Sequence, residues 1–142
     1  MEMRRDNSSR ALRTTLTIVL WIATLLSGLG IGVVGAAKFG NAREWERLFV
    51  GSGYPAWLSF VVGAAEVVGA IALLIPRFAL AGVTILGTVM AGALVTLLLH
   101  RGGPMGWGGT PAVHLVLLTI VAAIRLSRRR TIGLVRVSPV PQ

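Results

Sequence analysis

Residues 57–99 decide the fold, and they read WLSFVVGAAEVVGAIALLI, then Pro76-Arg77, then FALAGVTILGTVMAGALVTLLL. Each half is an apolar run of about the length that an α-helix needs to cross the hydrocarbon core of a bilayer. Because only two residues separate the runs, we expect a tight helical hairpin. Glu66 interrupts the first run near its middle, where a carboxylate costs at least about 2.5–3.5 kcal/mol on insertion scales.

The composition agrees with a membrane protein. Of the 142 residues, 54% are hydrophobic and 13% are charged, whereas about a quarter of the residues in a soluble domain are charged. Two further apolar runs flank the hairpin. The sequence therefore predicts an all-α integral membrane four-helix bundle, a single domain over residues 1–142 with spans at about 14–37, 57–75, 78–99 and 111–126.

The first run has a basic start, as a secretory signal peptide does. Its apolar stretch is longer than the core of a signal peptide, which is about 7–15 residues. We therefore expect the first run to be retained as a span.

The net charge of +9 comes from arginines that flank the apolar runs, so we expect contacts with anionic lipid headgroups and no nucleic-acid partner. Lys and Arg counts predict that both termini face the cytoplasm. Under that arrangement, ten basic residues lie inside: Arg4, Arg5, Arg10, Arg13, Arg77, Arg125, Arg128, Arg129, Arg130 and Arg136. Four lie outside: Lys38, Arg43, Arg47 and Arg101.

The segment from Lys38 to Tyr54 then faces outward, together with the Gly-rich loop at 102–109. Trp45, Tyr54, Trp57 and Trp107 fall at this outer boundary, as an aromatic belt would. Residues 43–49 read either as a short amphipathic helix on the membrane surface or as a solvated connector. The Gly-rich loop lacks the Lys-Ser/Thr that follows a phosphate-binding loop.

The chain has no cysteine, so it supplies no thiolate nucleophile, thiol redox relay or cysteine ligand. Small residues predict where the helices approach one another. Gly28 and Gly32 form a G-x-x-x-G pair in the first run. In the second run, one face carries Ser59, Gly63, Glu66, Gly69 and Ala70, and we expect this face to turn into the bundle.

Glu66 is the first candidate for a functional residue, and its candidate partners come from the outer ends of the other helices. These partners are Lys38, His100, Arg101 and His114. We expect the five to form a ligand-binding or ion-pair cluster. A purely structural role is the alternative. Lys38 and Arg101 would then anchor helix ends at the membrane surface, and Glu66 would pair with Lys38 to fix the helix register.

Catalysis is a further reading of Glu66, as a general acid or base. We predict no metal site, because His100, His114 and Glu66 are not at a recognisable ligand spacing.

The chain resembles the DoxX-like family of small four-span bacterial membrane proteins. The matching stretches are Gly35-Ala36-Ala37-Lys38-Phe39, Gly63-Ala64-Ala65-Glu66-Val67-Val68-Gly69, Leu73-Leu74-Ile75-Pro76-Arg77 and Met90-Ala91-Gly92-Ala93. The resemblance implies a multi-pass protein of the bacterial cytoplasmic membrane. It also implies that Lys38 and Glu66 are the lysine and the glutamate that recur in the family. It also implies a link to redox complexes or to membrane-protein assembly.

Three functions follow as hypotheses. The first is a quinone- or lipophile-binding membrane subunit of an oxidoreductase system, with a quinone as its ligand. The second is a non-enzymatic scaffold or chaperone that binds another membrane protein, or a further copy of itself, through its glycine faces. The third is a small membrane enzyme that acts on a lipophilic substrate through Glu66.

Overall fold

A computed structural model describes residues 2–99 and 110–135, and within them the side chains of residues 10–99 and 110–128. Over these residues the chain forms helices and turns, with no strand. The helices are α1 (Glu2–Gly40), α2 (Ala42–Gly51), α3 (Leu58–Leu74), α4 (Ala79–Leu99) and α5 (Thr110–Val135). The all-α membrane fold expected from the sequence is confirmed.

Three helices contain stretches long and apolar enough to cross a membrane: Arg10–Gly40 in α1, Ala79–Leu99 in α4 and Thr110–Arg128 in α5. The fourth apolar helix, α3, has 17 residues, or about 25 Å at about 1.5 Å per residue. That length is at the lower limit for a membrane crossing. A fourth crossing by α3 therefore stays a prediction.

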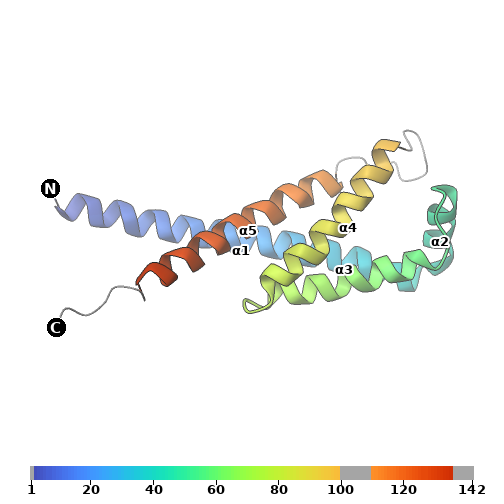
Figure 1. The fold of residues 1–142 in the computed structure, drawn as a ribbon, viewed down its shortest axis with the longest axis horizontal. Coiled ribbons are helices and arrows are strands. Elements are labelled where there is room, and N and C mark those ends of the chain that lie inside the picture. The colour runs from blue at the N-terminus through green and yellow to red at the C-terminus, as the bar shows by residue number, and fades with distance from the viewer. Residues whose placement is uncertain (1, 100–109, 136–142) are drawn as a thin grey trace.

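The four apolar helices pack as a ring, in which α1 and α4 each contact both α3 and α5. Figure 1 shows this arrangement, with the start of α1 and the end of α5 at the opposite end of the molecule from α2. The most deeply buried large side chains of the core are Leu73, Leu86, Leu118 and Val121. These come from α3, α4 and α5, so the core lies where these helices face α1.

The hairpin between α3 and α4 is tight, as the sequence predicts. Helix α3 ends before Ile75, which is extended, and Pro76 follows it. A Cβ at Gly82 would lie 2.7 Å from the carbonyl oxygen of Gly69. Only a glycine permits so close an approach of the two backbones.

Helix α2 lies across one end of the ring (Figure 1) and contacts α1 and α3. For residues 43–49 the sequence allowed either a short amphipathic helix or a solvated connector, and the structure has a helix there. Phe49 is its buried residue, and Arg43, Glu44 and Arg47 are exposed. Gly53 follows with φ of 80°, a conformation that glycine adopts at little cost, and the chain then turns into α3.

Candidate functional site

Lys38 and Glu66 form a buried ion pair. The Lys38 Nζ donates a hydrogen bond to the Glu66 Oε2, and each residue is only 3% exposed. Lys38 comes from the last turn of α1, and Glu66 from the centre of α3. The pair therefore joins two helices, and both charged groups are shielded from water.

Glycines allow the two helices to approach closely beside this pair. A Cβ at Gly35 would lie 2.7 Å from the Glu66 Cβ and 3.0 Å from the Gly63 carbonyl oxygen. A Cβ at Gly63 would lie 3.1 Å from both the Gly35 carbonyl oxygen and the Lys38 Cβ. The absence of a side chain at Gly63 thus leaves the space through which the Lys38 stem runs toward Glu66.

The same local sequence provides both halves of this crossing. Gly35-Ala36-Ala37-Lys38 on α1 faces Gly63-Ala64-Ala65-Glu66 on α3. In each, the glycine lies three residues before the charge and so on the same helix face. The two Gly-Ala-Ala stretches, one followed by Lys38 and the other by Glu66, thus provide both the close approach of α1 to α3 and the two opposite charges.

Helix α2 covers the pair through Trp45. The Lys38 Nζ lies 4.8 Å from the centroid of the Trp45 ring, within the range of a cation–π interaction. Trp45 is half-buried. The Lys38 ammonium thus contacts both the Glu66 carboxylate and the Trp45 ring.

A second set of polar contacts fastens the connector after α2. The Tyr54 hydroxyl lies 2.8 Å from the Thr96 Oγ1 of α4, and Thr96 also donates to the Gly92 carbonyl at 2.9 Å. The Ser59 hydroxyl donates to the Ala56 carbonyl at 2.8 Å. The contact between Tyr54 and Thr96 thus joins the connector before α3 to α4, and the other two bonds are local.

His114 lies on another side of α1. A Cβ at Gly30 would lie 3.2 Å from the His114 Nε2, and the His114 Nδ1 lies 2.7 Å from the Thr110 carbonyl oxygen. Gly30 and Gly35 are five residues apart, which places them on different helix faces at about 3.6 residues per turn. The structure thus brings together Lys38 and Glu66 from the expected cluster and places His114 elsewhere.

His100 and Arg101 lie outside the described residues, so their part in the expected cluster stays a prediction. Within the part of the chain that is described, no three His, Cys, Asp or Glu side chains are grouped in a way that could hold a metal ion.

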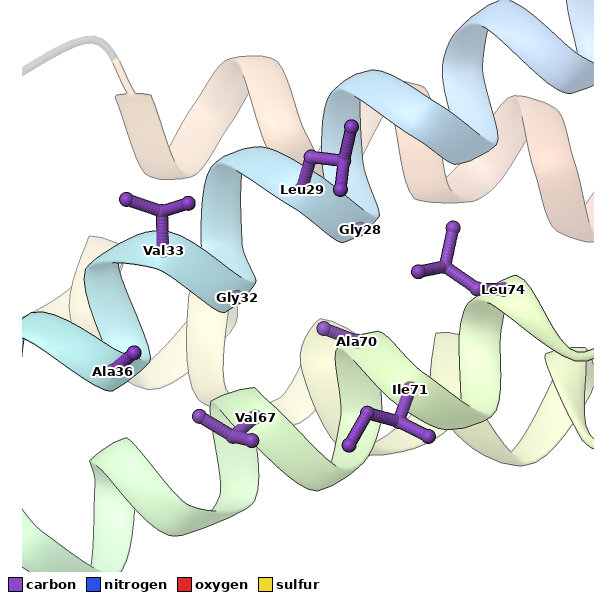
Figure 2. Close-up of a pocket in the computed structure, with 9 residues that line it drawn as sticks. All are labelled: Gly28, Leu29, Gly32, Val33, Ala36, Val67, Ala70, Ile71 and Leu74. Atoms are coloured by element: carbon purple, nitrogen blue, oxygen red, sulfur yellow. The ribbon is translucent and has the colours of Figure 1, made fainter.

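An apolar groove of about 240 Å³ runs between α1 and α3, and Figure 2 shows its lining from both helices. Its walls are made by Gly28, Leu29, Gly32, Val33 and Ala36 on α1 and by Val67, Ala70, Ile71 and Leu74 on α3. At one end of the groove, Ala36 and Val67 are the sequence neighbours of Gly35 and Glu66, and the Val67 Cγ2 would lie 3.2 Å from a Cβ at Gly35. Lys38 and Glu66 themselves do not line the groove.

The sequence analysis placed Gly63 on the inward face of α3 and Trp45 in an aromatic belt, but it predicted neither the contact of Gly63 with Gly35 nor that of Trp45 with Lys38. The repeat of Gly-Ala-Ala before each charge was a signal in the sequence for the glycines. No pattern predicted the contact of Trp45 with Lys38, because it depends on how α2 folds back over α1.

One family model matches the chain, that of the DoxX-like family, over residues 22–124. The match covers α2, α3 and α4 with parts of α1 and α5, and it includes both Lys38 and Glu66. No curated protein and no solved structure matches the chain.

Proposed function

The chain belongs to the DoxX-like family, and from that premise we propose that it is a lipophile-binding membrane subunit of an oxidoreductase system, with a quinone as its ligand. It acts as a multi-pass protein of the bacterial cytoplasmic membrane, and all four apolar helices cross the bilayer. The redox centre that exchanges electrons with the quinone belongs to a partner subunit in this proposal.

The observation that carries the proposal is an apolar groove between α1 and α3, one end of which is lined by Val67, the residue after Glu66 of the buried ion pair. Its volume of about 240 Å³ is just under the range for pockets that enclose drug-sized ligands, about 300–1,000 Å³. A groove of this size fits part of an isoprenoid tail, while the rest of the tail lies in lipid. Leu29 and Val33 on its rim are exposed, so a ligand can enter from the bilayer.

The ion pair supplies a polar group for the head of the ligand. An ammonium has three hydrogen-bond donors, and Lys38 gives one of them to Glu66. A further donor is available to a quinone carbonyl without separation of the two charges. A small shift of Trp45, which lies over Lys38, gives the carbonyl access.

A scaffold function is the second candidate, and the outer face of α4 favours it. The exposed residues between Ala79 and Leu94 are small: Ala81, Thr84, Thr88, Ala91 and Gly92. On α1, by contrast, the exposed residues include Leu25, Leu26 and Leu29. Small faces of this kind allow close helix–helix contact in lipid.

The test is purification in a mild detergent followed by solvent extraction and mass spectrometry of the lipids. We expect a quinone to co-purify, and Ala36→Phe, which fills the outer end of the groove, to remove it. Ala91→Phe is the matched control, because it places the same side chain on an exposed alanine of α4.

No co-purifying quinone, together with unchanged quinone-linked activity after deletion of the gene, would overturn the proposal. A specific partner crosslinked through α4 in the absence of any quinone would favour the scaffold. The enzyme hypothesis would gain if Glu66→Gln abolished turnover of a lipophilic substrate while the thermal midpoint stayed unchanged.

A further inference from the structure

The inward face of α1 carries two hydroxyl groups into the core of the bundle. Thr24 and Ser27 are both 0% exposed. At about 3.6 residues per turn they lie on the same helix face as Leu20 and Ile31, which belong to the apolar core cluster. The Thr24 Oγ1 and the Ser27 Oγ have no hydrogen-bond partner among the described residues. Because burial of a hydroxyl without a partner is unfavourable, we expect a ligand to provide one.

Serine and threonine hydroxyls elsewhere in α1, α4 and α5 bond to their own helix. Each of the following donates to the carbonyl oxygen four residues earlier, at 2.7–3.1 Å: Thr14, Thr15, Thr17, Thr84, Thr88, Thr96, Thr119 and Ser127. Thr24 and Ser27 do not make the corresponding bonds to the Leu20 and Ala23 carbonyls. Their hydroxyls are therefore available to a partner inside the ring of helices.

Helix α1 fills little of the interior of the ring at this level. Ala23, Thr24 and Ser27 lie between Leu20 and Ile31 on the buried face, and all three side chains are much smaller than these two. Helices α1 and α4 are on opposite sides of the ring, since each contacts α3 and α5. The small side chains of α1 therefore face the middle of the bundle. A small polar site enclosed by apolar side chains is the kind of place where a protein interior holds a water molecule.

We propose that Thr24 and Ser27 form a binding site for one buried water molecule, which bridges the Thr24 Oγ1 and the Ser27 Oγ. Water both donates and accepts hydrogen bonds, and the Leu20 and Ala23 carbonyl oxygens, one turn earlier, offer it further acceptors. The stretches 10–37, 67–99 and 110–128 contain no acidic residue, so a neutral ligand suits the site better than a cation does.

This site is independent of the quinone proposal. Neither Thr24 nor Ser27 lines the groove between α1 and α3, and both hydroxyls lie in the core rather than at the lipid-facing surface. The loss of one site therefore leaves the other intact, and the two proposals can fail separately.

The test is a double-mutant cycle on the full chain in one detergent, with Thr24→Val, Ser27→Ala and the double variant. Both substitutions nearly keep the shape of the side chain and remove only the hydroxyl. We expect each single variant to lower the thermal midpoint by a few degrees, because the water loses a partner. The double variant should lose less than the sum of the two single losses, because both hydroxyls act through the same water.

Thr84→Val and Thr88→Val are the matched control pair. Their hydroxyls are exposed and bond to carbonyls of their own helix, so their effects should be small and should add. For the main pair, a midpoint that rises in the single variants would mean that the hydroxyls have no partner at all. Additive losses would mean that each bonds separately to α1. Either result would overturn the proposal.

A crystal structure of the wild-type protein, at a resolution that shows ordered waters, provides the second measurement. We expect density for one water within hydrogen-bond distance of both the Thr24 Oγ1 and the Ser27 Oγ. If the two hydroxyls instead bond directly to the Leu20 and Ala23 carbonyls, with no water between them, the proposal is wrong.

Discussion

At the scale of single residues, two opposite charges are buried between α1 and α3. Lys38 and Glu66 are each almost completely buried, and the bond between them compensates for the hydration that both groups lose. A buried pair of this kind adds little net stability, but the loss of one partner leaves a charge without compensation. Lys38 lies two residues before the end of α1, whereas Glu66 is at the centre of α3. Removal of Lys38 and removal of Glu66 should therefore destabilise the protein by different amounts.

We therefore predict that Lys38→Met destabilises the protein more than Glu66→Gln does. A lysine near a helix end can extend its ammonium toward the membrane surface, but a carboxylate at the centre of α3 cannot reach it. Single losses should cost about 3–5 kcal/mol. The measurement is the thermal midpoint of each variant in one detergent.

The double variant Lys38→Met, Glu66→Gln is the control for this prediction. It leaves no buried charge, so it should be more stable than either single variant. If its loss of stability equalled the sum of the two single losses, the pair would not be coupled and the prediction would be wrong.

At the scale of elements, α2 determines how accessible the ion pair is. Its residue Trp45 lies over the Lys38 ammonium, while its exposed face carries Arg43, Glu44 and Arg47. The helix is thus amphipathic, with a covering role toward the bundle and a charged face away from it.

Lys38 is the only lysine of the chain, which makes its accessibility directly measurable. We predict that an amine-reactive acyl ester labels Lys38 slowly in the folded protein, and that Trp45→Ala raises the rate at least several-fold. Mass spectrometry of peptides separates Lys38 from the amino terminus. Trp57→Ala, in which an exposed tryptophan is removed from the same region, should leave the rate unchanged; an equal increase in that control would contradict a covering role for Trp45.

At the scale of the whole molecule, the two ends of the ring of helices differ in charge. The end with the first turns of α1 and the last turns of α5 is rich in arginine, and the end with α2 is balanced. The positive-inside rule assigns the arginine-rich end to the cytoplasm.

We predict that a fluorescent protein fused after Gln142 is fluorescent in bacteria, and that alkaline phosphatase fused after Gly53 is active. Each reporter works on one side of the membrane only, so the two fusions test an even number of crossings together with the orientation. Inactive phosphatase at Gly53 would mean that α2 faces the cytoplasm, and the assignment of both termini to the cytoplasm would then be wrong.

The helical membrane fold is predictable from the sequence because apolar runs of span length, the Pro76-Arg77 break and the flanking arginines are local properties of the chain. The inward face of α3 is predictable for the same reason: Ser59, Gly63, Glu66, Gly69 and Ala70 recur at helical spacing, and all are buried. The length of α1, which continues to Glu2, exceeds the predicted span because the polar residues before Thr14 also suit a helix.

The sequence by itself determined that the chain is a helical membrane protein in which Glu66 needs a partner, since hydrocarbon length and the cost of a buried charge are read residue by residue. Only the tertiary structure decided which partner Glu66 has. The choice of Lys38 and the separate place of His114 depend on how α1 rotates against α3 and α5. The close contact of Gly35 with Gly63 brings α1 and α3 together at this point, and the path of α2 places Trp45 over Lys38. Both depend on how helices distant in sequence pack against one another, although the Gly-Ala-Ala repeat is itself a local pattern.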